Sequence, residues 1–276
     1  MPQSDRSARF TKRAGIIMTG PIDLAIADGV AHLRFDCPDR LNVLDIEMAE
    51  AFLAATRTLL ANPSVRVLLL SGAGRSLMAG GDVRGFHGEA DKPAFIQATI
   101  DPLHSALKAL AASDIITIVA AHGRVAGAGV SLVSGADLSI CAADASFTLA
   151  YCRIAGVPDC GGSWALPRAI GLKQALAMAL LNEPLGADDA LRMGLVNKVV
   201  PPDELDGEAR TMASRIAAGS RQSQGRTKKL MRNAFETPLD QQLDAEKAAF
   251  MECAAHPDFA EGVSAFLERR TPVFET

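Results

Sequence analysis

Hydrophobic and polar residues alternate in two adjacent segments near the start of the chain, residues 22–27 and 30–35. Alternation with a period of two is typical of strands that bury one face. The residues between the segments are Asp28 and Gly29, and an Asp-Gly pair favours the tight turn of a β-hairpin. The pattern therefore predicts an antiparallel hairpin at this point of the chain.

A helix is expected after the hairpin. Apolar residues recur at spacings of three and four over residues 46–60, and Asp45 is placed to cap the first turn. Two uninterrupted apolar runs, residues 65–71 and 115–121, have the length of buried strands. A glycine-containing loop follows each run, so both loops are candidates for a site at the end of a strand.

The order of the remaining elements divides the chain into two parts. Short strands at residues 136–140 and 146–149 alternate with helices as far as about residue 202, and only helical patterns follow. This order predicts an α/β core with a helical C-terminal appendage. Helices are expected at residues 93–112, 130–134, 162–170, 172–181, 187–193, 204–218, 221–235, 239–255 and 257–269.

The composition narrows the class of protein. The 276 residues carry a net charge of −4, which argues against nucleic acid as the main partner because phosphate binding needs a basic surface. The five cysteines form no Cys-x-x-Cys pair, and the five histidines have no metal-ligand spacing, so reduced thiols, no metal and a cytoplasmic location are expected. No apolar run reaches the roughly 20 residues of a membrane span. Residues 1–20, mostly polar and basic, are expected to be a flexible leader.

Two glycine-rich loops are candidates for ligand binding. Met78-Ala-Gly-Gly-Asp82 follows the first buried strand, and Gly127-Ala-Gly129 follows the second and opens a helix. Glycine allows a ligand to approach the backbone closely, and the N–H groups at a helix start have no helical partner. Together the loops can supply two N–H donors to an oxyanion. The alternatives are an ordinary strand-to-helix turn and the tight packing of small residues.

A third candidate is the segment Gly156-Val-Pro-Asp159-Cys-Gly-Gly162. An aspartate just before a glycine-rich helix start is often a helix cap. A carboxylate at the same place is also a suitable proton acceptor for acid–base chemistry. The motif alone leaves both interpretations open.

The three loops, in this order and spacing, resemble the enoyl-CoA hydratase/isomerase (crotonase) family. The resemblance runs from about Pro21 to the C-terminus. It implies a spiral of ββα turns over residues 21–202 that carries an acyl-CoA site, and a helical trimerisation region over residues 203–276. It further implies a homotrimer or hexamer, with an acyl-CoA thioester as substrate and no separate cofactor. The segments that carry it are Asp39–Leu44, Met78–Asp82, Gly123–Asp137 and Gly171–Val199.

The resemblance also assigns roles to individual residues. It implies that the backbone N–H groups of Gly81 and Ala128 form an oxyanion hole for the thioester carbonyl. It implies that Phe266 and Arg269 reach the CoA of a neighbouring subunit. Residues implied to lie around the CoA nucleotide are Arg40, Val43, Leu44, Ala79 and Asp82.

The chain departs from the family's hydratases at the two positions where they carry glutamates. Ser131 and Tyr151 stand there, and neither is a base near neutral pH. Asp159 instead matches the acid of the family's isomerases, and residues 156–168 resemble the phenylacetate-type enoyl-CoA isomerases. We therefore expect Asp159 to shift a double bond by moving one proton. Val157, Trp164 and Leu166 are expected to desolvate its carboxylate.

Other interpretations stay open. The chain can be a hydratase with atypical residues, a relative of the aromatic acyl-CoA dehalogenases with Asp159 as nucleophile, or a non-catalytic acyl-CoA-binding paralogue. Tyr151 either lines the acyl pocket, bonds an intermediate or only packs. His104 is expected to face solvent or the core, and Cys152 and Cys160 are expected to be packing residues.

Overall fold

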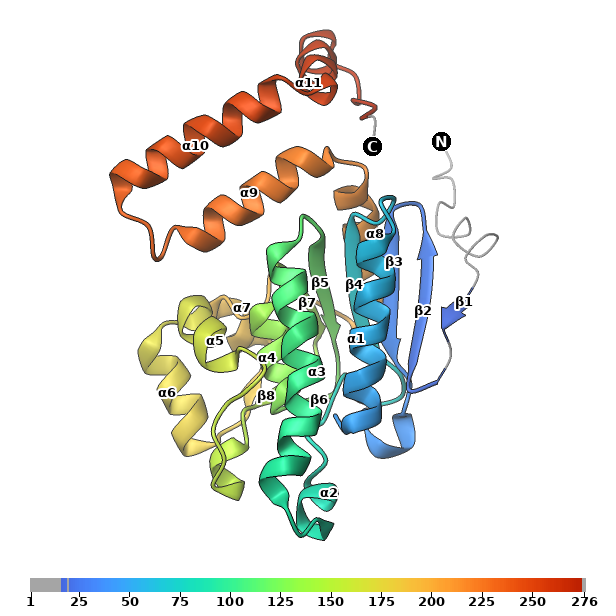
Figure 1. Cartoon of the computed structure of the whole chain (residues 1–276), viewed down its shortest axis with the longest axis vertical. Helices are drawn as coiled ribbons and strands as arrows, with labels where there is room; N and C mark the ends of the chain where they lie inside the picture. The colour runs from blue at the N-terminus through green and yellow to red at the C-terminus, as the bar shows by residue number, and fades with distance from the viewer. Residues whose placement is uncertain (1–15, 19, 275–276) are drawn as a thin grey trace.

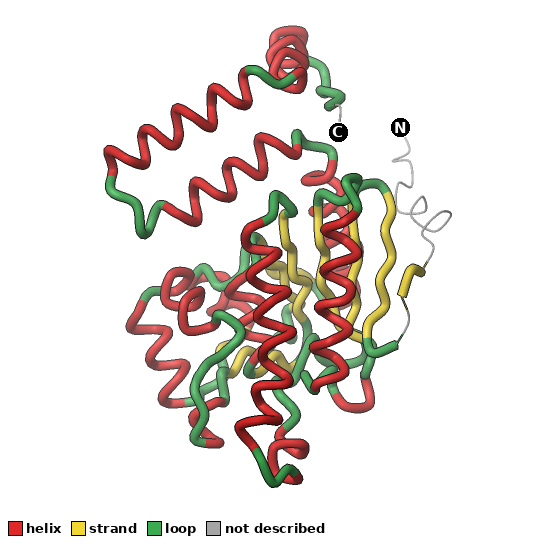
Figure 2. Tube along the Cα trace, in the orientation of Figure 1, coloured by secondary structure: helices red, strands yellow, loops and turns green. Residues whose placement is uncertain are grey.

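The computed structural model describes residues 16–18 and 20–274. It has an α/β core with a helical C-terminal region, as expected (Figure 1, Figure 2). The larger sheet consists, in spatial order, of β1 (Ile16–Met18), β2 (Ile22–Ala27), β3 (Val30–Phe35), β4 (Val67–Gly72), β5 (Ile116–Ala121), β7 (Leu138–Ala142) and β10 (Lys198–Val200). The smaller sheet consists of β6 (Arg124–Ala126), β8 (Ser146–Thr148) and β9 (Leu185–Gly186).

The helices follow the predicted ranges closely, and α2 is an addition to them. The α-helices are α1 (Ile46–Ala61), α2 (Val83–Gly88), α3 (Lys92–Ala112), α4 (Ala128–Gly135), α5 (Gly162–Ile170), α6 (Leu172–Leu181), α7 (Ala187–Met193), α8 (Leu205–Ala217), α9 (Arg221–Asn233), α10 (Leu239–Ala254) and α11 (Pro257–Glu268). Short 3-10 helices are η2 (Pro38–Arg40), η3 (Tyr151–Ile154) and η4 (Pro202–Glu204).

The expected hairpin is present. β2 pairs with β3 in antiparallel register from Ile22 opposite Phe35 to Ala27 opposite Val30. Both turn residues have positive φ angles, 50° at Asp28 and 78° at Gly29, as a type I′ turn requires. From β3 onward the pairs β3–β4, β4–β5, β5–β7 and β7–β10 are parallel, so the carboxyl ends of these strands lie on one edge of the sheet.

The sheet is covered on both faces, which explains the uninterrupted apolar runs of the sequence. On β4, Leu68 and Leu70 belong to a core cluster with residues of α1 and α3, whereas Val67 and Leu69 belong to a second cluster with α8. Successive side chains of a strand point to opposite faces, so a strand between two helical layers is apolar throughout. In Figure 1, α1 and α3 cross the near face of the sheet.

The structure differs from the expected boundaries at two places. Ile16–Met18, within the predicted leader, form β1 and pair with β2, because an edge of the hairpin is free to accept a third strand. Residues 1–15 and 19 of the leader lie outside the described residues. α8 was expected to open the C-terminal region at residue 203, but its Ala209 and Ala213 are buried against the sheet and belong to the core.

α9 is attached to the core by a buried ion cluster. Lys228 Nζ lies 3.1 Å from the Asp137 carboxylate and donates to the carbonyls of Leu110 and Ile115. Arg232 donates to the other oxygen of Asp137 at 2.6 Å. Burial lowers the pKa of Lys228, and the charge of Asp137 opposes that shift. α10 and α11 project beyond the core (Figure 1).

One partly buried histidine makes the stability of the fold sensitive to acid. Burial, followed by the charge of Arg210, lowers the pKa of His32 from 6.5 to about 4. Between these values the unfolded chain binds a proton that the folded chain does not, so folding stability falls as the pH drops. We expect a loss of about 3 kcal/mol from this residue between pH 7 and pH 4. Urea unfolding of the wild type and His32→Gln at both pH values measures it, and equal pH dependence in the two proteins contradicts it.

Within the described residues, no helix is long and apolar enough to cross a membrane.

Candidate functional site

The first glycine-rich loop, residues 78–82, is held by backbone hydrogen bonds to the segment after β3. Ala79 N–H donates to the Leu41 carbonyl at 3.0 Å, and Leu44 N–H donates to the Gly80 carbonyl at 2.8 Å. Asp82 N–H donates back to the Leu44 carbonyl at 3.0 Å. The two segments therefore form a fixed pair, although 35 or more positions separate them in the sequence.

A buried amide, Asn42, fixes the approach to this loop. Its side-chain NH₂ lies 2.8–3.2 Å from the carbonyls of Ala73, Ser76 and Leu77, and its side-chain oxygen accepts the Cys37 N–H at 2.9 Å. Asn42 is fully buried and has a φ of 54°, a conformation that asparagine tolerates better than most residues. Asn42 was not among the predicted site residues. Its signal was a single amide between apolar residues in the segment Arg40-Leu-Asn-Val-Leu44.

We expect Asn42→Ala to destabilise the fold by about 2–3 kcal/mol, because it leaves buried backbone groups without partners. Chemical denaturation measures the loss. The matched control is Asn233→Ala, which removes an exposed amide at the end of α9 and is expected to change stability by no more than about 0.5 kcal/mol. Equal effects of the two substitutions contradict the role given to Asn42.

The two glycine-rich loops lie against each other. Ala126 N–H donates to the Met78 carbonyl at 2.9 Å, and a Cβ added at Gly127 would lie 3.3 Å from Gly80 Cα. Gly127 also has a φ of 51°, so a side chain there would strain the backbone as well. Only glycine at this contact lets the loops approach so closely.

This contact brings the two predicted oxyanion donors to neighbouring positions. Gly81 follows Gly80, and Ala128 follows Gly127 as the first residue of α4. Neither the Gly81 N–H nor the Ala128 N–H donates a hydrogen bond to any group in the described part of the chain. The positive end of the α4 dipole adds to the field at Ala128. The arrangement can hold an oxyanion between two backbone donors.

Asp159 is not a helix cap. The residue that caps α5 is Gly161, and no side chain caps this helix. Instead, Asp159 Oδ1 accepts hydrogen bonds from the Tyr151 hydroxyl and, at 3.0 Å, from the Cys160 thiol. Oδ2 has no hydrogen-bond partner among the described residues. The carboxylate is thus anchored through one oxygen, and the other is free for a substrate.

Tyr151 connects Asp159 with the oxyanion donors. A Cβ added at Gly127 would lie 3.8 Å from Tyr151 Cζ, so the phenol stands between the α4 start and the carboxylate. Burial, followed by the charge of Asp159, raises the pKa of the phenol far above its usual range. Tyr151 therefore keeps its proton and acts as a donor to Asp159 at every physiological pH.

The turn after Asp159 is held by His104, which differs from the role expected for that histidine. Cys160 N–H donates to His104 Nε2 at 3.2 Å, so the ring proton of neutral His104 is on Nδ1. Cys160 has a φ of 53°, a strained conformation that such a contact helps to maintain. Burial, then the charge of Asp159, raises the pKa of the Cys160 thiol. Cys160 is therefore a protonated donor within the site and not only a packing residue.

Other expectations around Asp159 need correction. Val157 is 79% exposed and Trp164 is 41% exposed, with Arg168 stacked on its ring at 4.1 Å, so neither provides the expected apolar cover. Only Leu166 is buried. Ser131 is also buried, and a Cβ added at Gly162 would lie 2.3 Å from its hydroxyl oxygen. The Ser131 hydroxyl makes no hydrogen bond within the described chain.

The structure brings most, but not all, of the predicted binding residues together. Leu44, Ala79 and Asp82 belong to the paired segments, and Arg40 forms an ion pair with Asp45 at 2.7 Å. Val43 lies between Asn42 and Leu44 in the same segment and is half-buried. Phe266 and Arg269, at the end of α11, are far from this loop in the same chain (Figure 1). No three His, Cys, Asp or Glu side chains of the described chain are grouped as a metal site.

Comparison with known proteins identifies the family. The model of the enoyl-CoA hydratase/isomerase family matches residues 25–276. A protein named "Probable enoyl-CoA hydratase" from Rhodobacter capsulatus is 34% identical over 90% of this chain and 95% of its own. The 1,2-epoxyphenylacetyl-CoA isomerase of Escherichia coli is 34% identical over 90% of this chain and 96% of its own.

A solved structure agrees with the sequence comparison. An enoyl-CoA hydratase from Polaromonas sp. JS666 superposes with a TM-score of 0.86 at 30% identity, over 93% of this chain and all of the other. The class defined by the fold and the loops is that of acyl-CoA enzymes. The chain belongs to the enoyl-CoA hydratase/isomerase family, and the expected crotonase-like fold is confirmed.

Proposed function

We propose that the protein shifts a carbon–carbon double bond in an enoyl-CoA thioester. The thioester carbonyl accepts hydrogen bonds from the Gly81 and Ala128 N–H groups, which acidifies a carbon conjugated with it. Asp159 Oδ2 removes a proton from that carbon, and the electron pair moves onto the carbonyl oxygen as an enolate. The same carboxyl group returns the proton to a different carbon. No atom is gained or lost, so the reaction needs no cofactor and no water.

The observation that carries this proposal is the single free carboxylate oxygen of Asp159, which Tyr151 connects with the loop of the two donors. Hydration uses two groups that can exchange protons, one for the water and one for the carbon. At the two positions where the family's hydratases carry glutamates, this chain has Tyr151 and the buried Ser131. The pKa of the Tyr151 phenol is raised above its usual range, so it keeps its proton. Asp159 alone is suited to take up and return a proton, and one such group is sufficient for isomerisation.

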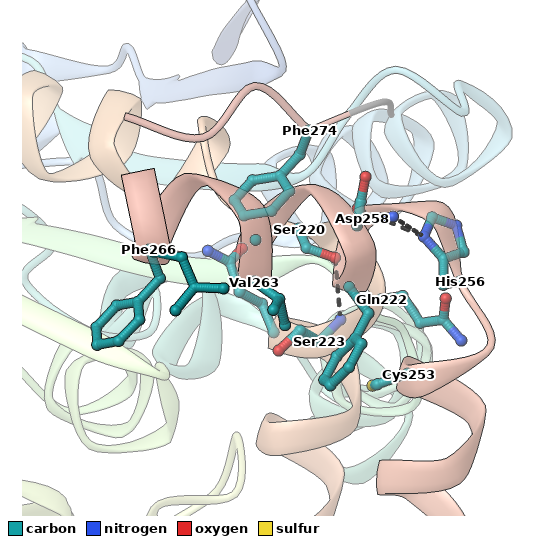
Figure 3. Close-up of a pocket in the computed structure, with 13 residues that line it drawn as sticks. Ser220, Gln222, Ser223, Cys253, His256, Asp258, Val263, Phe266 and Phe274 are labelled. Atoms are coloured by element: carbon teal, nitrogen blue, oxygen red, sulfur yellow. Dashed lines mark hydrogen bonds and ion pairs between the residues drawn. The ribbon is translucent and has the colours of Figure 1, made fainter. Parts of the chain in front are cut away.

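The exposed apolar surface of the C-terminal helices is consistent with an assembly of several copies of the chain. Large apolar side chains are exposed on α10 and α11, a pattern that marks protein–protein contacts. A hollow of about 480 Å³ lies between the start of α9 and α11. Val263, Phe266 and Phe274 are among the residues that line it (Figure 3). We propose a homotrimer or hexamer in which Phe266 and Arg269 complete the CoA site of a neighbouring subunit. The exposed apolar residues include Leu239, Leu243, Phe250, Met251, Phe266 and Leu267.

The proposed reaction is tested in deuterated water with a 3-enoyl-CoA and a 2-enoyl-CoA, each incubated separately with the protein. Mass spectrometry and NMR identify the products. The proposal expects a shifted double bond, deuterium in the product and no added water. A 3-hydroxyacyl-CoA product would instead identify a hydratase with atypical residues. In a separate incubation with a halogenated aromatic acyl-CoA, release of halide would identify a dehalogenase. Binding of acyl-CoA without turnover of any of these substrates would identify a non-catalytic paralogue.

The contact between His104 and the Asp159 turn gives a further prediction for this reaction. We expect His104→Ala to lower kcat roughly tenfold, because the loss of one hydrogen bond lets the strained turn move. KM for the enoyl-CoA is expected to change less than kcat, since the main effect of His104 is on the position of the Asp159 turn. His104→Gln offers an amide oxygen to the Cys160 N–H and should restore most of kcat. No rescue by glutamine, or a change in KM alone, contradicts this role.

A further inference from the structure

A cavity of about 600 Å³ begins beside the Asp159 turn and extends to α9. Its inner end contains His104, Ser131 and Cys160, and Cys160 bonds directly to the Asp159 carboxylate. Its outer end is formed by residues of α9 that the proposed chemistry does not use. We propose that this cavity takes the acyl chain, and that its outer end selects acyl groups that terminate in a carboxylate. The inference rests on the proposed function for the position of the thioester.

The middle of the cavity suits a hydrocarbon chain. It lies between α3, α4 and α5, and its wall contains Leu107, Leu110, Leu132 and Ala165 together with Trp164. A pocket of this size, apolar in its middle and polar at its ends, is typical of small-molecule sites. At the inner end the Ser131 hydroxyl is buried and has no hydrogen-bond partner among the described residues.

The outer end carries an excess of positive charge. Asp137 is shared between Lys228 and Arg232, Asp114 pairs with Lys229, and Glu236 pairs with Arg168. Arg168 does not line the cavity, so its four lining cations are Lys228, Lys229, Arg232 and Lys108. Lys108 makes no ion pair in the described part of the chain. Lys108 is exposed and lies one helical turn after His104 on the same face of α3.

This charge distribution favours an anionic end group over a methyl group. A carboxylate at the end of the acyl chain would pair with the exposed Lys108 and would not need to be buried against the apolar wall. A methyl group gains nothing from Lys108. The CoA phosphates are the other anions of the substrate, and they are a competing explanation for the cations. Removal of Lys108 separates the two explanations. It weakens the binding of CoA itself only if Lys108 pairs with the CoA phosphates.

Isothermal titration tests the proposal with CoA and with two saturated acyl-CoA thioesters of equal chain length, one ending in methyl and one in carboxylate. These ligands do not react, so the result is independent of Asp159 chemistry. Wild type is expected to bind the carboxylate-ended thioester about tenfold more tightly. Lys108→Met should abolish that preference without weakening CoA. Lys173→Met, which removes an exposed lysine on α6, is the matched control and should keep the preference.

A second variant tests the cavity itself. Gly135 lines the cavity, and a Cβ added there meets no atom within 4 Å, so Gly135→Leu is chosen to place a side chain at the cavity wall. It should weaken both acyl-CoA thioesters at least fivefold and leave CoA unchanged. The proposal is overturned if wild type does not prefer the carboxylate, if Lys108→Met weakens CoA equally, or if Gly135→Leu binds both thioesters like wild type.

Discussion

Asp159→Asn is expected to lower kcat for enoyl-CoA isomerisation by about 10³-fold, in the range that a positioned general base contributes. The amide keeps the size of the side chain and can still accept from Tyr151 and Cys160, so the turn is expected to remain in place. What it loses is the ability of the free oxygen to hold a proton. Steady-state kinetics in both directions and the rate of deuterium incorporation measure the effect.

The matched control is Asp203→Asn, which removes one carboxylate from an exposed position in η4. It should retain wild-type kcat and KM. Binding of a saturated acyl-CoA to Asp159→Asn should also be unchanged, because the oxyanion donors belong to other loops. Asp159→Asn with wild-type turnover would exclude Asp159 as the proton shuttle, whereas lost binding would show that the substitution damages the site more widely.

Asp137→Ala is expected to destabilise the fold by about 3–5 kcal/mol, the range found when one partner of a buried ion pair is removed. The side chains of Asp137 and Lys228 are 11% and 4% exposed. Asp137 also accepts from the Thr117 N–H at 2.8 Å, so its removal leaves a strand amide and two cations without their acceptor. Denaturant unfolding followed by circular dichroism measures the loss.

Glu208→Ala is the matched control for Asp137→Ala, because it breaks the ion pair between Lys198 and Glu208 on the surface of the core. Both side chains of that pair are more than a third exposed, and such pairs contribute about 0–1 kcal/mol. If the two substitutions destabilise the protein equally, burial does not govern the contribution of the Asp137 cluster.

Most of the fold could be predicted from local patterns. The turn at Asp28-Gly29, the cap at Asp45 and the apolar runs of β4 and β5 are each decided by neighbouring residues. Asp45 accepts the Met48 N–H at 2.8 Å, as expected of an N-cap. Strands β1, β6, β9 and β10 were missed because they have only two or three residues and are defined by pairing with other segments.

The candidate site was predicted less completely, because its contacts join distant parts of the sequence. Asp159 and the two glycine loops could be found from their motifs. The contact of His104 with Cys160 spans 56 positions and leaves no local signal. The exposure of Val157 could not be predicted either, because an apolar side chain beside a carboxylate in the sequence need not pack on it. The roles of the site residues in catalysis stay predictions.

The position of α9 decides where this chain can be divided into independent parts. α9 supplies Lys228 and Arg232 to a carboxylate inside the core, whereas α10 buries no residue of its own. A chain cut after α8 would leave that carboxylate without cations, but a chain cut in the turn before α10 would keep them. The Asp137 cluster therefore joins α9, but not α10, to the core. A junction for exchanging C-terminal arms keeps this cluster, and the ion pair of Glu236 with Arg168 of α5, only if it follows Glu236.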